Sequence, residues 1–398
     1  MTRVAQERAA ISQASSRWGS GALAVALLLG VIAIQTAQAE KFKVLYNFTG
    51  AGDGGNPYAG LVRGASNLYG TTSNGGKSFE GAVFQVTMSG KETVLYSFTG
   101  GADGGQPYSD LVLDAAGNLY GTTANGGTSG NGTVFEVSPS GQETVLYSFA
   151  GYPTDGAAPW GGLIQDAAGN LYGTTNRGGS SGMGTVFKVD TTGTETVLHT
   201  FAGGATDGAH PYFTRLKMDQ AGNVYGVTEQ GGASGQGVVF EISSSGTFSL
   251  LHSFAGGATD GSYPSGPLIR DSLGNLRGTT TYGGTANLGT VFELSASGTL
   301  TVLHSFAGGT TDGSLPCGGL LQDLAGNLYG TAAGGGAFGV GTIYKLTKSG
   351  TFTVLHSFKA LSDGAYPYGT VLDAKGHIFS TALEGGSGSY GTVFELIQ

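Results

Sequence analysis

Seven carboxylates recur in the chain, each in an Asp-Gly pair that lies four residues before a Pro. Carboxylates gathered on one face of a molecule could attract a cation or a cationic partner. The same residues also suit a turn, in which Asp caps the loop, Gly takes the left-handed conformation and Pro sets the entry into the next strand. Close packing of seven unneutralised carboxylates would be repulsive, so we interpret them as structural turn residues. They are Asp53, Asp103, Asp155, Asp207, Asp260, Asp312 and Asp363.

The residue after each of these Pro residues is aromatic in five of the seven units. An aromatic ring offers an apolar face for a sugar ring, and Tyr and Trp add a polar tip. The alternative is packing between neighbouring units, because large aromatic side chains are more often buried than displayed. Ser265 and Cys317 interrupt the series in two consecutive units. The candidate ligand-binding residues are therefore Tyr58, Tyr108, Trp160, Tyr212 and Tyr368.

Four histidines recur at one position, where earlier units carry Tyr46, Tyr96 and Tyr147 in the phrase VLYSF. Zinc ligands must all approach within about 2.1 Å of the metal, which side chains on four separate units cannot do. We therefore expect a structural role, with no metal and no cofactor. The four are His199, His252, His304 and His356.

Two motifs for catalysis or nucleotide chemistry are absent from the sequence: there is no H-E-x-x-H and no phosphate loop. Cys317 is the single cysteine, so it cannot form an intramolecular disulfide, and no His recurs near it as a partner. Titratable groups unique to single units are few, namely Glu229, Arg177 and Glu384. We predict no catalytic residue.

The elements that position these side chains follow from the repeat itself. The Asp-Gly pairs are separated by 50, 52, 52, 53, 52 and 51 residues. Each unit carries four short segments rich in β-branched and aromatic residues, separated by clusters of Gly, Asn, Asp, Ser and Pro. One set reads DLVLD, NLYGTT, GTVFEV and ETVLYSF. Four strands in about 50 residues are typical of a β-propeller blade, so the sequence predicts an all-β, seven-bladed propeller with four antiparallel strands per blade.

Both ends of the repeat region are out of phase, which favours a closed ring. Residues 41–48 read as a fourth strand without a blade before it, and residues 391–398 read as a third strand without a fourth. Pairing of these two strands would complete the last blade and remove an exposed sheet edge. We therefore expect the N-terminal strand to close the ring.

The connections sort by length onto two faces if the strands run outward from the axis in chain order. The tight turns of the type DAAGN and SPSG would share one face, and the Asp-Gly loops would share the other with the Gly-rich loops after TT. Long loops on a rigid scaffold are where binding usually occurs. The loop-rich face is therefore the predicted binding face.

Residues 1–39 have the pattern of an export signal. Arg3, Arg8 and Arg17 precede an apolar run at 22–34, and Ala-Gln-Ala at 37–39 suits cleavage. The apolar run is shorter than the roughly 18 residues of a membrane span. We expect residues 40–398 to form one propeller domain, secreted, periplasmic or at the cell surface, without a membrane span after cleavage.

The charge balance narrows the class of partner. Loss of residues 1–39, which hold three Arg and one Glu, takes the net charge from -9 to near -11. Phosphate binding requires clustered Lys and Arg, so we expect no nucleic-acid partner. We expect a monomer.

The repeated phrase resembles the GloVer tandem-repeat family of secreted bacterial proteins. The resemblance rests on GLxxDxxGNLYGTTxxGGxxGxGTVF followed by TVLYSF, and it extends over residues 41–398. The first half, seen in GLIQDAAGNLYGTT at 162–175, is also similar to the inner strands of NHL-type propellers. The resemblance implies a surface or exported protein and no established chemistry.

Two functions remain open on these observations. The first is a non-catalytic binding or cell-envelope interaction module that takes a glycan or a surface protein on the loop-rich face. The alternative is an extracellular propeller enzyme, such as a lyase, lactonase or glycosidase, acting at the mouth of the channel. Propellers host both. A purely structural matrix component is a third possibility.

Overall fold

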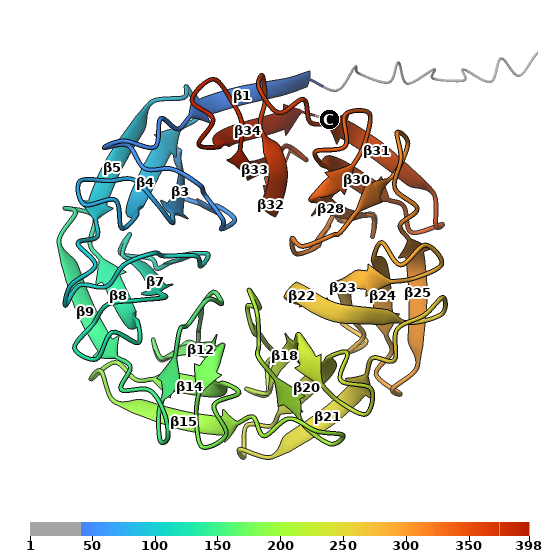
Figure 1. Ribbon diagram of the computed structural model, residues 1–398, viewed down its shortest axis with the longest axis horizontal. Helices are drawn as coiled ribbons and strands as arrows, with labels where there is room; N and C mark the ends of the chain where they lie inside the picture. The colour runs from blue at the N-terminus through green and yellow to red at the C-terminus, as the bar shows by residue number, and fades with distance from the viewer. Residues whose placement is uncertain (1–40, 374, 398) are drawn as a thin grey trace, which may run out of the picture. The chain divides into compact units, whose positions relative to one another are not determined.

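The computed structural model describes residues 41–373 and 375–397, and every regular element in this part of the chain is a β-strand. The expected export signal at 1–39 lies outside the described residues, so its boundary stays a prediction. Seven four-stranded antiparallel sheets surround one axis, as Figure 1 shows in a view along that axis. The predicted seven-bladed propeller is confirmed.

Each blade begins with a strand next to the axis. These innermost strands are β2 (Val62–Arg63), β6 (Val112–Leu113), β11 (Ile164–Gln165), β17 (Lys217–Met218), β22 (Gly261–Arg270), β27 (Leu321–Gln322) and β32 (Ala365–Leu372). The second strands are β3 (Asn67–Thr72), β7 (Leu119–Thr123), β12 (Leu171–Thr175), β18 (Val224–Thr228), β23 (Leu276–Gly283), β28 (Leu328–Ala332) and β33 (Ile378–Glu384). These two positions lie nearest the centre in Figure 1.

The third and fourth strands lie farther out. The third are β4 (Ala82–Thr87), β8 (Thr133–Val137), β14 (Thr185–Val189), β20 (Val238–Ile242), β24 (Thr290–Leu294), β30 (Thr342–Leu346) and β34 (Thr392–Ile397). The outermost are β5 (Glu92–Ser97), β9 (Glu143–Ser148), β15 (Glu195–Thr200), β21 (Phe248–Ser253), β25 (Leu300–Ser305), β31 (Phe352–Ser357) and β1 (Lys41–Asn47). We number the blades 1 to 7 from β2–β5 to β32–β34.

The N-terminal strand completes blade 7. β1 pairs antiparallel with β34 from Lys41↔Ile397 to Asn47↔Thr392, so the sheet order is β1-β34-β33-β32. This pairing gives both edge strands a partner, and the predicted ring closure is confirmed.

Three blades carry an extra two-stranded ribbon on the loop side. The pairs are β10 (Gly156–Ala157) with β13 (Arg177–Gly178), β16 (Gly208–Ala209) with β19 (Gln230–Gly231), and β26 (Gly313–Ser314) with β29 (Gly334–Gly335). In blades 5 and 7 the same pairing belongs to the longer strands β22–β23 and β32–β33.

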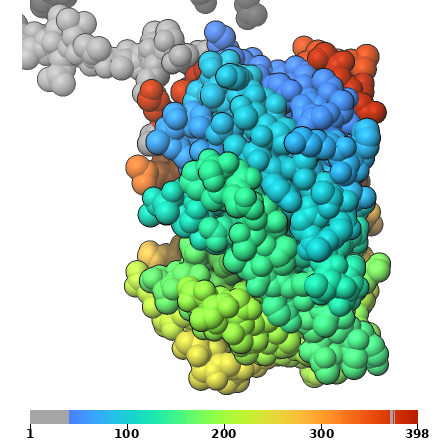
Figure 2. All heavy atoms as spheres, turned by 90° about the vertical axis from the view of Figure 1, so that its left-hand side faces the viewer, coloured from blue at the N-terminus to red at the C-terminus, as the bar shows by residue number. Residues whose placement is uncertain are grey.

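The hydrophobic core lies between neighbouring blades. Each junction buries the Phe of the VLYSF or VLHSF phrase, as Phe98 packs at 5.0 Å ring separation against Phe135 of blade 2. Burial of such a side chain contributes roughly 1.5–3 kcal/mol. Seven equivalent junctions hold the blades together, and Figure 2 shows blades 1 to 4 following one another along the outer edge. The seven fully buried residues are Phe48, Phe98, Phe149, Phe201, Phe254, Phe306 and Phe358.

Candidate functional site

The seven Asp-Gly carboxylates are held by their own loops. In Asp103, Oδ2 accepts hydrogen bonds from the Tyr96 hydroxyl at 2.9 Å and from the Thr99 backbone N–H at 2.8 Å. In Asp207, the carboxylate lies 3.0 Å from His199 Nε2 and accepts the N–H of Gly208 at 2.7 Å. A Tyr or His of the preceding outer strand contacts the Asp in all seven loops. These contacts leave the carboxylates little capacity to bind an external cation.

The Gly after each Asp does not have the single role that the sequence predicts. A left-handed backbone occurs at Gly54, Gly104 and Gly364, with φ of +93°, +92° and +109°. The prediction is wrong for the other four, Gly156, Gly208, Gly261 and Gly313, whose φ is not in the left-handed region. A Cβ on any of the seven would meet the side chain that ends the TT, VT or TA pair of the second strand at 2.2–2.7 Å. Close approach of the backbone is therefore what requires Gly.

Two kinds of junction occupy two separate arcs of the outer ring. Three junctions combine the Asp with Tyr and with a Glu that begins the next outer strand, as in Tyr147, Asp155 and Glu195. Burial and then the negative charge of Asp155 raise the pKa of Glu195 to about 7. Glu92 and Glu143 have pKa values raised to about 7 for the same reasons, burial first and then Asp53 or Asp103.

The other four junctions combine the Asp with His, and an apolar residue replaces the Glu. His199 stacks on Phe248 at 4.0 Å, and His304 stacks on Phe352 at 3.9 Å. Phe42 stacks in the same way on His356, and Leu300 occupies the fourth position. Each histidine thus serves its own junction. Among the described residues, no group of three or more His, Cys, Asp or Glu could hold a metal ion.

The aromatic residues after Pro converge at the loop-rich end of the channel. Tyr58 lies 5.3 Å from Tyr108 and 5.2 Å from Tyr368, and Trp160 lies 5.1 Å from Tyr212 between ring centroids. All five are half-buried. They pack on one another around the axis, each against rings of neighbouring blades, and ligand binding by them stays a prediction. Burial first, then the charge of Glu229, raises the pKa of Tyr212 to about 12.

Phe213 completes this aromatic cluster and was missed in the sequence. Its ring stacks on Tyr58 at 5.6 Å and on Trp160 at 6.1 Å, and it lies 4.2 Å from Tyr212. The sequence signal is a spacing: Pro211 and Leu216 are five residues apart, whereas the equivalent residues in other blades are four apart. The backbone of Phe213 has φ of +46°. One inserted residue therefore places a ring in the mouth of the channel.

The cluster leaves little free space. A cavity of about 30 Å³ remains between the aromatic rings, Cys317 and the glycines of the inner strands. A water molecule needs about 10–15 Å³ of such volume, so the cavity admits a few waters at most. Burial raises the pKa of Cys317 to about 12, which keeps the group as an unreactive thiol at neutral pH.

The three titratable groups unique to single blades do not form a site together. The charge of Glu384 helps to raise the pKa of Tyr58, after burial, and the charge of Glu229 acts in this way on Tyr212. Arg177 is exposed in β13. No hydrogen bond or ion pair joins the three in the part of the chain that the structure describes.

The residue before each Pro forms a second set of positions on the loop-rich face. All seven have φ between +52° and +55°, and none is Gly. Left-handed backbone costs a residue with a Cβ roughly 1–2 kcal/mol. The side chains differ from blade to blade, unlike those of the surrounding repeat. They are Asn56, Gln106, Ala158, His210, Tyr263, Leu315 and Tyr366.

A pocket lies beside one of these positions, between blades 4 and 5. Tyr263 and Tyr282 form a T-shaped pair at 5.8 Å and line a cavity of about 350 Å³ together with Gln236 and Asn287. Tyr282 is 41% exposed. Asn287 Oδ1 accepts the N–H of Gly283 at 2.9 Å, which fixes the amide beside the rings. The pocket thus joins two aromatic rings with two amide groups.

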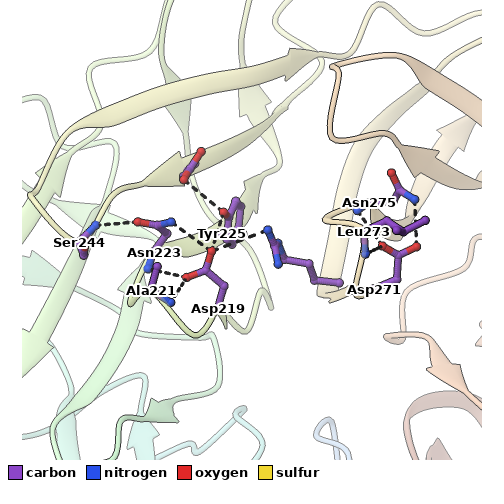
Figure 3. A network of polar contacts seen from close by, with 10 residues as sticks. Asp219, Ala221, Asn223, Tyr225, Ser244, Asp271, Leu273 and Asn275 are labelled. Atoms are coloured by element: carbon purple, nitrogen blue, oxygen red, sulfur yellow. Dashed lines mark hydrogen bonds and ion pairs between the residues drawn. The ribbon is translucent and has the colours of Figure 1, made fainter.

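The opposite face is built from tight turns whose carboxylates are also occupied. Asp219 Oδ1 accepts the N–H groups of Ala221 and Asn223 at 2.9 and 3.0 Å, and Oδ2 accepts the Tyr225 hydroxyl at 3.0 Å (Figure 3). These hydrogen bonds hold the pKa of Asp219 below its usual range, although burial acts in the opposite direction. Asp271 repeats the arrangement in blade 5. Gly117, Gly169 and Gly222 give the equivalent turns of blades 2 to 4 the positive φ that they require.

Comparison with known families decides the relationship of the chain. The profile of the Gloeobacter/Verrucomicrobia repeat matches residues 27–219 and 212–398. The chain belongs to this family. Among curated proteins, none matches this Gloeobacter/Verrucomicrobia repeat protein in sequence. No helix within residues 41–373 and 375–397 has the length and apolar character to span a bilayer.

Solved structures resemble the Gloeobacter/Verrucomicrobia repeat protein in fold. The extracellular domain of a protein described as a hybrid two-component system from B. thetaiotaomicron aligns with a TM-score of 0.56 at 12% identity. The alignment covers 89% of this chain and 41% of that one. A gluconolactonase from Xanthomonas campestris aligns at 16% identity with a TM-score of 0.42, covering 71% of this chain and 82% of that one. At these identities the likeness concerns the fold alone.

Proposed function

We propose that the protein is an exported, non-catalytic binding module that recognises a carbohydrate through its loop-rich face. The observation that carries this proposal is the pocket between blades 4 and 5. Its volume of about 350 Å³ lies within the range of small-molecule sites. Ring faces suit the C–H face of a sugar, and the amides of Gln236 and Asn287 suit its hydroxyl groups.

The pair of tyrosines in the pocket is specific to this junction between blades. Tyr263 has φ of +54°, where Gly would avoid the strain, and the chain contains 76 Gly. All seven blades share this conformation, so the feature that distinguishes this junction is its pair of tyrosine side chains. Tyr282 contacts Tyr263 from β23, at a position that the other blades fill with Asn, Arg, Gln, Gly or Glu. The blade-specific pairing of two tyrosines therefore supports recognition at this junction.

The alternative of an enzyme acting at the loop-rich mouth of the channel has less support. That mouth is filled by the aromatic cluster of Tyr58, Tyr108, Trp160, Tyr212, Phe213 and Tyr368. The remaining cavity of about 30 Å³ is too small for a sugar lactone.

A glycan array followed by calorimetry on the purified protein tests the proposal. We expect binding that Tyr282→Ala weakens about tenfold or more, because the exposed ring face is lost. Tyr282→Phe should retain most of the affinity. Phe338→Ala is the matched control, since Phe338 is 57% exposed in a loop of blade 6 and does not line the pocket. Absence of glycan binding would contradict the function, and binding unchanged by Tyr282→Ala would contradict the site.

A further inference from the structure

The turn-face end of the central channel contains a second cavity, which is wider than the one between the aromatic rings. It measures about 400 Å³ and is lined by residues of all seven blades, with Gly369 as the contribution of blade 7. Gln165, Lys217 and Met218 line it and also line a shallow depression among the tight turns. The cavity therefore opens toward the turn face.

Two charged side chains enter this cavity from different blades. Asp110 of blade 2 and Arg215 of blade 4 occupy equivalent positions in the repeat. Each comes directly before a Leu that is buried next to the inner strand. The other blades place uncharged residues there, namely Gly60, Gly162, Pro267, Gly319 and Thr370. Charge at this level of the channel is thus confined to two blades.

Asp110 is fixed by a hydrogen bond, whereas Arg215 is only within ion-pair distance of it. Asp110 Oδ1 accepts the N–H of Gly60 at 2.5 Å, which fixes the carboxylate. Arg215 Nη1 lies 3.8 Å from Asp110 Oδ2, an ion-pair distance that is too long for a hydrogen bond. Within the described residues, no hydrogen bond from the Arg215 guanidinium is found. Its side chain is 42% exposed, so its donors remain accessible to a ligand in the cavity.

The remaining wall supplies one more cation and apolar surface. Lys217 follows Arg215 on the same strand and is exposed toward the opening. Leu61, Ile164 and Leu268 line the cavity between the polar groups. Arg215 and Lys217 together outweigh Asp110 by one charge. The three turn carboxylates of the outer depression, Asp166, Asp219 and Asp271, accept hydrogen bonds from their own turns.

We propose that this cavity binds a small hydroxylated carboxylate of the sugar-acid class. A guanidinium presents a planar fork that matches a carboxylate in two hydrogen bonds. Asp110 Oδ2 accepts a hydroxyl proton of the same ligand, and the leucine and isoleucine walls contact its C–H groups. The volume of about 400 Å³ suits a ligand of this size. The site uses none of the residues of the pocket at Tyr263 and Tyr282, so it goes beyond the proposed function.

Calorimetry with three probes tests the class of ligand. D-Glucuronate carries the carboxylate and the hydroxyl groups, D-glucose lacks the carboxylate, and acetate lacks the sugar. We expect saturable binding of D-glucuronate, with D-glucose and acetate each weaker by roughly tenfold or more. Equal binding of acetate would contradict the sugar part, equal binding of D-glucose would contradict the carboxylate part, and no saturable binding of D-glucuronate would overturn the proposal.

Variants of the two charged residues test the site itself. Arg215→Ala should weaken D-glucuronate roughly tenfold or more, and Arg215→Lys should recover only part of the loss because the planar fork is absent. Asp110→Asn keeps an oxygen for the Gly60 N–H but removes the charge, so we expect the preference for D-glucuronate over acetate to fall. Arg177→Ala is the matched control, because Arg177 is an exposed arginine on the loop-rich face.

The outcomes separate this proposal from the glycan pocket. An unchanged melting temperature in Arg215→Ala shows that the fold is intact, and unchanged D-glucuronate affinity in that variant would overturn the site. Loss of D-glucuronate binding in Tyr282→Ala would also contradict it, because that residue lies outside the cavity. Glycan binding on the array that survives Arg215→Ala leaves the two sites independent, as expected.

Discussion

The two ends of the central channel contrast in both packing and charge. At the loop-rich end, six aromatic rings from blades 1 to 4 and blade 7 leave a cavity of about 30 Å³. At the turn end, the same inner strands enclose about 400 Å³ with an arginine and a lysine in the wall. The channel is therefore closed at the loop-rich end and open at the turn end.

Both ends depend on one short segment of blade 4. Phe213 and Arg215 are two residues apart, on the segment that is one residue longer than its counterparts in the other blades. The insertion adds a ring to the aromatic cluster, and the following residues carry the charge into the cavity. A departure from the repeat in a single blade thus makes the two ends of the channel different.

The largest effect is expected from opening the ring, because both ends require seven blades around one axis. Deletion of β1, residues 41–47, leaves β34 without its partner and removes Leu45, which is buried against the blade 1 junction. Each buried apolar side chain contributes roughly 1.5–3 kcal/mol. We expect a cooperative fall in the melting temperature of the whole domain by circular dichroism. A truncated protein with an unchanged melting curve would contradict ring closure.

A smaller effect should follow from Phe213→Ala, which alters the loop-rich end alone. Loss of a half-buried aromatic ring should lower the free energy of unfolding by about 2 kcal/mol, less than for a fully buried Phe. Urea denaturation measures the change. Affinity for D-glucuronate should remain as in the unaltered protein, and Tyr366→Ala, at an exposed position in blade 7, should leave stability nearly unchanged. A variant as stable as the parent would show that the cluster does not depend on Phe213.

The sequence was sufficient for the scaffold because the scaffold is local. The TVLYSF phrase, the Asp-Gly loop and the NLYGTT strand each depend on neighbours within about 50 residues, and the blade order and ring closure follow from them. The channel was different. Tyr58 and Trp160 contact Phe213, and Asp110 lies near Arg215, only once the ring has formed, because the residues of each pair belong to different blades. No pattern along a single repeat specifies those contacts.

The left-handed residues illustrate the same limit. The sequence predicts Gly after Asp as the left-handed position, because Gly is the residue that takes positive φ most easily. The backbone takes that conformation at Ala158, His210 and Tyr263 instead, where it meets the preceding blade. The requirement comes from the junction between blades, and residue preference does not reveal it.

The smallest effect concerns pH, and it separates the outer ring from the channel. Glu92, Glu143 and Glu195 have pKa values raised from 4.5 to about 7, chiefly by burial. Because the folded state holds these protons more tightly than the unfolded chain, their stabilising contribution is full below about pH 4.5 and is lost as the pH rises through 7. We expect less than about 1 kcal/mol from each, since solvent screens half-exposed carboxyls.

Replacement of the three residues by Gln measures this contribution. The free energy of unfolding of the parent, minus that of the triple variant, should fall between pH 4.5 and 7, while the histidine junctions contribute equally to both proteins. Glu136→Gln should give a difference of the same sign, because burial also raises the pKa of Glu136. A difference that rises with pH would contradict the assignment.

A crystal structure of the protein grown with D-glucuronate would show whether the channel is closed at the loop-rich end and binds its ligand from the turn face. We expect the carboxylate of the ligand to form hydrogen bonds with the Arg215 guanidinium, a ligand hydroxyl group to contact Asp110, and the aromatic cluster around Phe213 to stay closed. A ligand lying among Tyr58, Tyr108 and Trp160, with Phe213 displaced toward solvent, would contradict this expectation.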